Sequence, residues 1–277
     1  MRISYYPGCS LQGTAIEYDQ SIKAVAKKLG IELVELPDWN CCGASSAHAL
    51  DFTLAKNLAA RNLALAQEQK LDLLVPCAAC YSRLRAAKEE EGAPPPTKDD
   101  FQILNILELF NREEIIKKIA SLIKNPLQGL KVVPYYGCLL VRPPRFTGAK
   151  NFENPKEMDN LLKLIGAEVV PWSYKTDCCG GSLILTQKDM VFRLVKKIFA
   201  QALAAGAEAM AVACPLCHSN LDTRQKEIAQ GVDAAYEIPI FYISELIGLA
   251  LGDNDSRRWW KKHFISPVKI LEKRAVI

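Results

Sequence analysis

The sequence predicts an α/β fold of two duplicated domains, each a small parallel sheet flanked by helices, related to each other by a pseudo-two-fold axis. Two observations support this prediction. The same cysteine motifs occur twice, in the same order, along the 277 residues. In each half, strand-like segments alternate with segments of helical apolar spacing, which is typical of a parallel sheet covered by helices. The repeated unit is therefore a domain rather than a short solenoid module.

All ten cysteines fall into two matching sets. Each set reads Gly-Cys, then Cys-Cys-Gly, then Cys-x-x-Cys. The first cysteine set is Cys9, Cys41, Cys42, Cys77 and Cys80, and the second cysteine set is Cys138, Cys178, Cys179, Cys214 and Cys217. From the Cys-Cys pair onward, equivalent positions differ by 178 − 41 = 137. We place the boundary near 125–129, which predicts domains over 1–128 and 129–277.

The first half alternates strands and helices. Ile3–Tyr6 is a short strand candidate that leads to Cys9, and Thr14–Leu29 has the apolar spacing of a helix that ends at Gly30. The remaining elements expected are a strand at Ile31–Leu36, a helix at Asp51–Gln69, a strand at Leu71–Val75, a helix from the first Cys-x-x-Cys to about Glu90, a loop over 91–100, and a strand or helix at Ile103–Phe110.

The second half repeats this order. The elements expected are a strand at Lys131–Tyr136, a helix near Pro155–Ile165, a strand at Glu168–Pro171, a helix at Thr186–Ala205, a strand at Ala209–Ala213 followed by a helix, and a last strand at Ile238–Ile243. The cysteine motifs come directly after strand ends, which is where open α/β sheets build their sites.

The composition excludes several classes of protein. Hydrophobic residues make up 49% and charged residues 24% of the chain, as in ordinary globular proteins. The net charge, 35 − 31 = +4, is too small to indicate nucleic-acid binding. No apolar run approaches the roughly 20 residues that span a bilayer. The first ten residues lack the apolar segment of a signal peptide, so we expect a cytoplasmic protein.

Reduced cytosolic thiols indicate metal or redox chemistry rather than a disulfide framework. A lone Cys-x-x-Cys is ambiguous between zinc, iron–sulfur and thiol redox chemistry. Each half offers five thiols, whereas tetrahedral zinc and a cubane iron–sulfur cluster each take four. Neighbouring cysteine side chains diverge, which suits a multi-iron cluster better than one zinc ion. The spacing therefore favours iron–sulfur over zinc, and zinc remains the alternative.

The pattern resembles the duplicated cysteine-rich CCG domain found in the B subunit of heterodisulfide reductase. The resemblance covers nearly the whole chain, and all six cysteine motifs match it. It implies that each cysteine set holds one 4Fe–4S cluster of the non-cubane type, the first set holding cluster 1 and the second set cluster 2. It also implies an oxidoreductase component that cleaves a small disulfide, of the coenzyme M–coenzyme B type or related, between the two clusters. Electrons would arrive from the iron–sulfur C subunit and the flavin-bearing A subunit of such a complex.

Other tasks remain open for the same clusters. Related CCG proteins occur in complexes of lactate, glycerol-phosphate, succinate and sulfur oxidation, where such a chain relays electrons or anchors the complex. A zinc-stabilised interaction module without catalysis is a further alternative. The sequence has no G-x-G-x-x-G motif, so we expect another redox protein to supply the electrons.

Several polar residues near the motifs have both a functional and a structural interpretation. His48 and His218 could donate protons, but a hydrogen-bonded or surface histidine is the favoured interpretation. Arg142, Arg145 and Lys175 could bind an anionic substrate, although ordinary surface charge is favoured for each. The tyrosines that precede the lone cysteines are expected in the strand core rather than as proton donors; they are Tyr5, Tyr6, Tyr135 and Tyr136.

The C-terminal tail RRWWKKHFISPVKILEKR (257–274) combines tryptophans with cations. Trp and Arg are common interface anchors, so docking to a partner through 257–277 is one hypothesis. Packing against the protein's own surface is an equal alternative, and contact with a membrane surface ranks last. We expect His263, within this basic tail, to be exposed to solvent.

Overall fold

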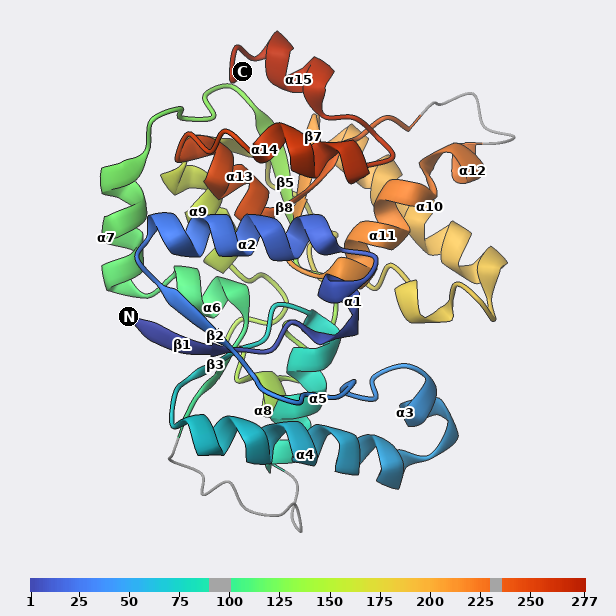
Figure 1. Ribbon diagram of the computed structural model, residues 1–277. Coiled ribbons are helices and arrows are strands. Elements are labelled where there is room, and N and C mark those ends of the chain that lie inside the picture. Colours follow the sequence, from blue (N-terminus) through green and yellow to red (C-terminus); the bar gives the residue numbers. More distant parts are fainter. Residues whose placement is uncertain (90–100, 230–235) are drawn as a thin grey trace.

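The computed structural model describes residues 1–89, 101–229 and 236–277 and contains two four-stranded parallel sheets (Figure 1). Their strand orders are β2-β1-β3-β4 and β6-β5-β7-β8, the same arrangement used twice. Helices flank both sheets. The predicted α/β class and the duplication are therefore confirmed, whereas the loop expected over 91–100 lies outside the described residues.

The first half forms its sheet from short, buried strands. The strands are β1 Arg2–Tyr5, β2 Glu32–Glu35, β3 Leu73–Leu74 and β4 Ile103–Leu104. Its helices are α1 Gly8–Gln12, α2 Ile16–Lys28, α3 Ser46–Leu50, α4 Phe52–Gln69, α5 Ala78–Glu89, α6 Ile106–Phe110 and α7 Glu113–Leu122.

The second half repeats the sheet and adds the tail. Its strands are β5 Lys131–Tyr135, β6 Glu168–Val169, β7 Ala209–Val212 and β8 Ile240–Tyr242. Its helices are α8 Pro144–Thr147, α9 Glu157–Leu164, α10 Lys188–Ala204, α11 Pro215–Thr223, α12 Gln225–Ala229, α13 Ile243–Ala250, α14 Ser256–Trp259 and α15 Val268–Lys273, with short 3₁₀ turns η1 Gly181–Leu183 and η2 Trp260–Lys262.

The ambiguous segment Ile103–Phe110 contains both a strand and a helix. The strand β4 ends at Leu104, and Asn105 then caps α6 by accepting the N–H groups of Leu107 and Glu108. The Glu108 carboxylate accepts the Asn105 N–H in return at 2.8 Å, which completes a capping box. A two-residue strand followed at once by a helix gives no single periodicity, so the sequence pattern was ambiguous here.

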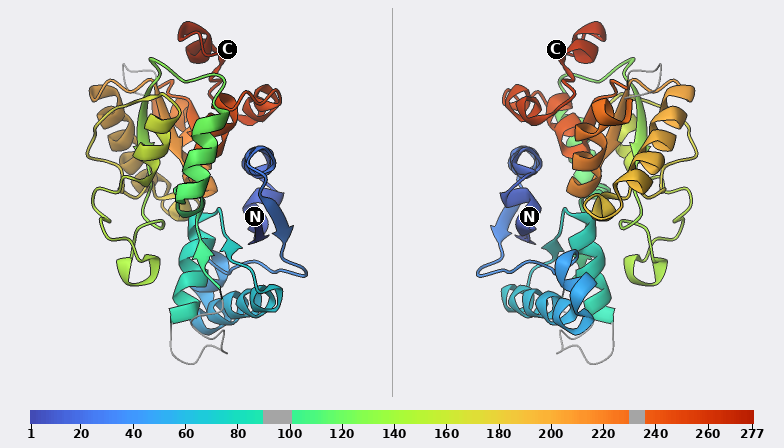
Figure 2. Two further views of the ribbon diagram at one scale, coloured as in Figure 1. Left: turned by 90° about the vertical axis from the view of Figure 1, so that its left-hand side faces the viewer. Right: turned by 90° about the vertical axis from the view of Figure 1, so that its right-hand side faces the viewer.

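Each half packs the helix after its last strand against the other half. The helix α13 packs on α2, and α6 packs on α9 (Figure 1). In Figure 2 the dark blue α2 lies against the red helices of the second half. At this contact the Tyr18 and Tyr242 rings stack with centroids 4.0 Å apart, and the hydroxyls of Ser21 and Ser244 lie 2.6 Å apart. The exchange is reciprocal, as a pseudo-two-fold relation requires, and the boundary near 125–129 stays a prediction.

The C-terminal tail packs against the protein's own surface. Trp259 and Trp260 are 2% and 3% exposed, so neither is free to anchor a partner. Asp222 accepts the backbone N–H groups of Phe264 and Ile265, which ties the tail to α11. His263 is buried, so the expectation that it is exposed was wrong, because the tail folds inward over α13. Among the described residues no helix is long and apolar enough to cross a membrane.

We predict that Gly248→Val lowers the free energy of unfolding by about 1–3 kcal/mol, as overpacking of a tight core does. A Cβ at Gly248 would lie 2.9 Å from two ring carbons of Trp259 and 3.5 Å from Val25. The ring cannot move without disturbing the packing of α14 on α2. Chemical denaturation measures the effect. The exposed Ala204→Val serves as the control, and equal stability of the two variants would contradict the prediction.

Candidate metal centres at the interface of the two halves

The cysteine motifs follow strand ends in both halves. Cys9 lies in α1 after β1, and the first Cys-x-x-Cys starts at the end of β3 and runs into α5. Cys138 follows β5 in the same way, and the second Cys-x-x-Cys follows β7 and runs into α11. Because β1 pairs with β3 and β5 with β7 in parallel, the motifs of each half meet at one edge of its sheet.

The first cysteine set converges at this edge. The Sγ atoms of Cys42 and Cys80 lie 3.1 Å apart. Cys42, Cys77 and Cys80 are buried, whereas Cys9 and Cys41 are exposed. The centre therefore has a buried inner side and an outer side open to solvent.

The second cysteine set has the same form. Cys138 and Cys178 have their Sγ atoms 3.8 Å apart, and those of Cys179 and Cys217 are 3.7 Å apart. One cavity is lined by all five thiols of this set together with Ala78 of the first half. A compact group of five thiols around a cavity fits an iron–sulfur cluster, whose ligands are thiolates.

The two sets touch through their innermost members. The thiols of Cys77 and Cys214, each the first cysteine of a Cys-x-x-Cys, hydrogen-bond to each other across the domain interface. Both side chains are 3% exposed. The fold thus brings all ten predicted site residues into two adjacent groups, and the contact between the groups was not visible in the sequence.

The environment of the Cys-Cys pairs favours thiolates, the form that binds metals. Hydrogen bonds with Cys41 and Cys80 lower the pKa of Cys42 to about 4. A hydrogen bond from Cys138 lowers the pKa of Cys178 to about 6, and the backbone N–H of Gly180 also donates to its sulfur, at 3.3 Å. Two backbone or thiol donors thus stabilise negative sulfur in each half before any metal is considered.

One tyrosine in each half holds the Cys-Cys pair in place. Tyr6 donates its hydroxyl to the carbonyl of Asn40 at 2.7 Å, and Tyr135 donates to the carbonyl of Asp177 at 2.6 Å. Both carbonyls belong to the residue directly before the pair. The expectation that all four tyrosines lie in the core is confirmed, since each is at most 1% exposed. Aligning the two Gly-Cys motifs makes Tyr6 and Tyr135 equivalent, and that equivalence was the signal for this role.

The glycines before the lone cysteines are required by close contact. Gly8 and Gly137 both have φ +65°, in the left-handed region that favours glycine. A Cβ would lie 3.3 Å from the Cys80 sulfur at Gly8 and 2.9 Å from the Cys217 sulfur at Gly137. Glycine at these positions therefore lets the lone-cysteine loop approach the Cys-x-x-Cys sulfur.

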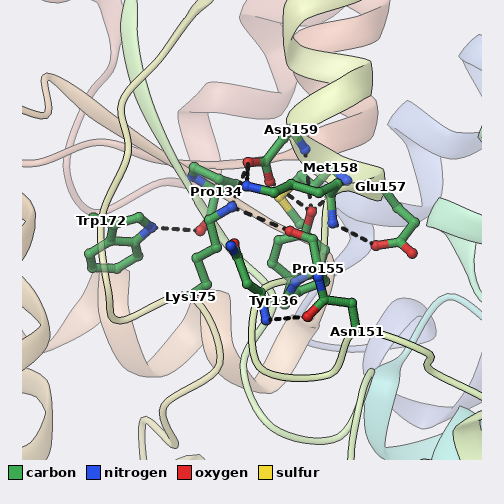
Figure 3. A network of polar contacts seen from close by, with 11 residues as sticks. Pro134, Tyr136, Asn151, Pro155, Glu157, Met158, Asp159, Trp172 and Lys175 are labelled. Atoms are coloured by element: carbon green, nitrogen blue, oxygen red, sulfur yellow. Dashed lines mark hydrogen bonds and ion pairs between the residues drawn. The ribbon is translucent and has the colours of Figure 1, made fainter.

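Lys175 belongs to a buried polar network rather than to an anion site. Its ammonium pairs with Asp159 at 2.5 Å, and the Tyr136 hydroxyl donates to the same carboxylate at 2.9 Å (Figure 3). Lys175 and Asp159 are both 4% exposed. The network fixes the chain that leads into the second Cys-Cys pair, because the Lys175 carbonyl accepts the Tyr136 N–H at 2.8 Å. Asp159 was not predicted, since nothing in its local sequence marks a buried charge.

The other candidates take ordinary structural roles. Arg142 donates to the carbonyl of Thr176 and pairs with Glu153, and the Arg145 guanidinium stacks over the Phe146 ring at 4.5 Å. His218 is buried and its Nε2 donates to the carbonyl of Ile240 at 3.0 Å, which is the hydrogen-bonded role favoured from the sequence.

Comparison with known proteins identifies the domain. Residues 3–85 and 132–222 each match the cysteine-rich CCG domain. The chain is 34% identical over 262 residues to the 8-methylmenaquinol:fumarate reductase membrane anchor subunit of Wolinella succinogenes, covering 90% of this chain and 92% of the relative. It is 27% identical over 290 residues to the B subunit of the ferredoxin/F(420)H(2)-dependent CoB-CoM heterodisulfide reductase of Methanosarcina acetivorans, covering 98% and 96%.

A solved structure agrees with the fold. A hypothetical protein from Helicobacter pylori superimposes with a TM-score of 0.66 at 11% identity, covering 96% of this chain and 52%, about half, of that chain. This likeness concerns the fold alone. The two domain matches and the sequence relatives show that this chain belongs to the cysteine-rich CCG domain family, with two copies of the domain, and that it is related to the B subunits of heterodisulfide reductases.

Proposed function

We propose that this chain is the catalytic iron–sulfur subunit of a heterodisulfide reductase-like complex and that it reduces a small disulfide between two clusters. The observation that carries the proposal is the hydrogen bond between Cys77 and Cys214, which joins the two cysteine sets. A disulfide takes up two electrons, one for each sulfur. Two adjacent one-electron centres in a single chain match that requirement.

The ten cysteines are the proposed ligands. The first set binds one 4Fe–4S cluster and the second set binds the other, both of the non-cubane type because each set has a fifth thiol. When bound, such clusters supply one-electron transfer. The residues of the chain position them, since Tyr6 and Tyr135 hold the Cys-Cys pairs and the buried inner cysteines keep water from the contact between the sets.

A second candidate is electron relay in a quinol-linked complex. The 34% identical relative carries the name of a quinol:fumarate reductase component, and this identity exceeds that of the heterodisulfide reductase relative cited above. In this role the same two centres pass electrons through the chain without a disulfide substrate. The two candidates share the clusters and differ in whether thiols are released.

Electrons must reach the clusters from another redox protein, and the surface offers a docking face. Six of the nine large hydrophobic side chains that are exposed in the described chain lie in two short segments, each shortly after a Cys-Cys-Gly motif. They are Leu50, Phe52 and Leu54 in the first half and Leu183, Leu185 and Met190 in the second. The helices α3 and α10, which belong to these segments, both lie on the right-hand side of Figure 1. We call these two segments, 50–54 and 183–190, the apolar rim.

The apolar rim suits a protein partner. Exposed apolar side chains gathered on one face mark interaction sites in soluble proteins. Exposed cations follow the rim along α10, at Lys188, Arg193, Lys196 and Lys197, so the matching surface is acidic. We propose an iron–sulfur or flavin protein as the partner, because the exposed Cys41 and Cys178 place the outer side of both centres beside the rim. This position replaces the tail, whose tryptophans are buried.

We predict on the order of eight irons per chain after anaerobic purification, from two four-iron clusters. Cys179→Ala and Gly137→Ala should each remove about half of this iron, because Cys179 is a proposed ligand and a Cβ at Gly137 meets the Cys217 sulfur at 2.9 Å. Cys42→Ala should remove the other half. Iron and zinc analysis with electron paramagnetic resonance measures the result.

Gly206→Ala is the matched control for Gly137→Ala. Gly206 also has a positive φ, +84°, yet a Cβ there meets nothing within 4 Å, so the backbone strain is similar without the sulfur contact. Its iron content should stay complete. Stoichiometric zinc in place of iron, or loss of both clusters from one substitution in a folded protein, would show that the two-cluster assignment is wrong.

We predict that the assembled complex releases two thiols for each disulfide consumed when a reduced one-electron dye supplies the electrons. The thiols are counted with a chromogenic reagent under anaerobic conditions. Cys77→Ala should lower this rate at least tenfold, because it removes one partner of the contact between the sets. Quinol oxidation without any thiol release would overturn disulfide reduction and support the second candidate.

We predict that Leu50→Glu and Leu185→Glu each weaken binding of the redox partner at least tenfold. A carboxylate in the apolar rim loses apolar contact and meets an acidic surface on the partner. Binding is measured by co-purification and by the rate of reduction with the partner as donor, and the dye-driven rate should stay unchanged. The control is Leu203→Glu, an exposed apolar residue of α10 outside the rim. Equal weakening by the control variant would exclude the rim as the docking face.

A further inference from the structure

Three residues of metal-binding type lie together outside the cysteine sets. His218 is on α11, Glu245 is in the first turn of α13, and His263 is in the C-terminal tail. All three are buried, and one potential ligand atom from each lies within 4.8 Å of the others. We call this group the His-Glu-His cluster. None of the proposed redox steps uses it.

Hydrogen bonds already orient the members of the cluster. Glu245 accepts the Tyr242 N–H with one carboxylate oxygen at 2.9 Å and lies 3.0 Å from His263 Nε2 with the other. His218 donates Nε2–H to the Ile240 carbonyl, which leaves Nδ1 with the lone pair. A histidine that binds a metal commonly donates its other ring nitrogen to a backbone carbonyl in this way. The imidazole rings of His218 and His263 lie 4.8 Å apart at 65°.

The pocket around the cluster carries an excess of buried negative charge. Three carboxylates are buried here, since Glu17 of α2 and Asp222 of α11 interact electrostatically with His263 and Glu245. Burial raises the pKa of both Glu17 and Asp222. His263 and the tail's Lys262 are the cations that interact with them. A divalent cation would offset this charge, which is costly to bury unpaired.

One polar atom in the cluster has no partner. His263 Nδ1 is buried without a hydrogen bond, although the His263 side chain is fully enclosed. Buried polar atoms are almost always paired, so an orphan atom beside two further ligands indicates a missing ion or water. The ion pair between His263 and Glu245 alone leaves this nitrogen unsatisfied.

The first half shows what the equivalent site looks like without these ligands. Subtracting 137 relates His218 to Tyr81 and Glu245 to Glu108. There the Tyr81 hydroxyl donates to Glu108 at 3.0 Å, and the described first half supplies no residue in the place of His263. The duplication therefore preserved the carboxylate in both halves, while the second half alone acquired two imidazoles around it.

We propose that His218, Glu245 and His263 bind one divalent first-row transition-metal ion, for which Zn²⁺ is the natural probe. Two imidazoles and one carboxylate form a known zinc ligand set, with water in the fourth position. Bonds of about 2.0–2.1 Å bring tetrahedral ligands to about 3.3 Å from one another, so side-chain rotations from the present spacing suffice. The ion would fasten the tail to α11 and α13, beside the contact with α2, and it is independent of the proposed redox function.

The test uses the full chain with its clusters and Zn²⁺ as the added metal. We expect one zinc per chain in addition to the iron. X-ray absorption at the zinc edge should give nitrogen and oxygen neighbours at about 2.0–2.1 Å and no sulfur at about 2.3 Å. Zinc should raise the midpoint of thermal unfolding of the wild-type protein. A sulfur shell would place zinc in the cysteine sets and overturn the proposal, as would the absence of bound zinc.

Two variants localise the ion. His263→Gln and His218→Tyr, the latter copying the first half, should weaken zinc binding at least tenfold and abolish the thermal effect, while iron content stays unchanged. The matched control is His48→Gln, since His48 is the remaining histidine and lies in α3 of the other half. Full zinc affinity in both cluster variants would refute the assignment. The spectrum of the wild-type protein decides the question even if a variant folds poorly.

Discussion

Two buried thiols from different domains, Cys77 and Cys214, hydrogen-bond to each other, and much of the architecture follows from this contact. Each thiol stands at the end of a central strand, so the two sheets must present the same edge to each other. Two sheet edges of parallel strands can meet in this way only if helices are displaced from between them. The helices after the last strands accordingly pack outward, each on the opposite half.

This exchange of helices explains why polar residues occur in the interface. The Ser21–Ser244 hydroxyl pair and the Tyr18–Tyr242 stack join α2 to the β8–α13 corner without leaving a polar atom exposed to an apolar surface. Gly248 allows Trp259 of the tail to lie against α13 at the same place. The tail is thus a third layer over the contact, which the first half lacks. The duplication is symmetric in its sheets and asymmetric in what covers them.

Internal repetition made the sheets and the cysteine sets predictable. Equivalent motifs at a constant offset identify ligands, and short apolar runs before them identify strands, because both signals are local. The tail, the Lys175–Asp159 pair and the contact between Cys77 and Cys214 were not predictable in this way. They depend on which half packs on which, and a repeat shows that two units are alike without showing how they meet. The buried His263 is the clearest case, since a basic, aromatic tail gives no sign of the carboxylate it reaches.

The distribution of exposure across the cysteines gives the two centres a direction. In each set the Cys-x-x-Cys thiols face the interface and are buried, while Cys41 and Cys178 of the Cys-Cys pairs reach solvent. Under the proposed function, electrons enter at the exposed side and leave at the buried contact between the sets. A solvent-exposed entry allows a partner to approach closely, and a dry interior strengthens electrostatic interactions where charge is transferred. The apolar rim lies at the exposed side in both halves, so the symmetry of the fold offers two equivalent entries. The tail packs against only one half, and this asymmetry gives a partner a means of distinguishing them.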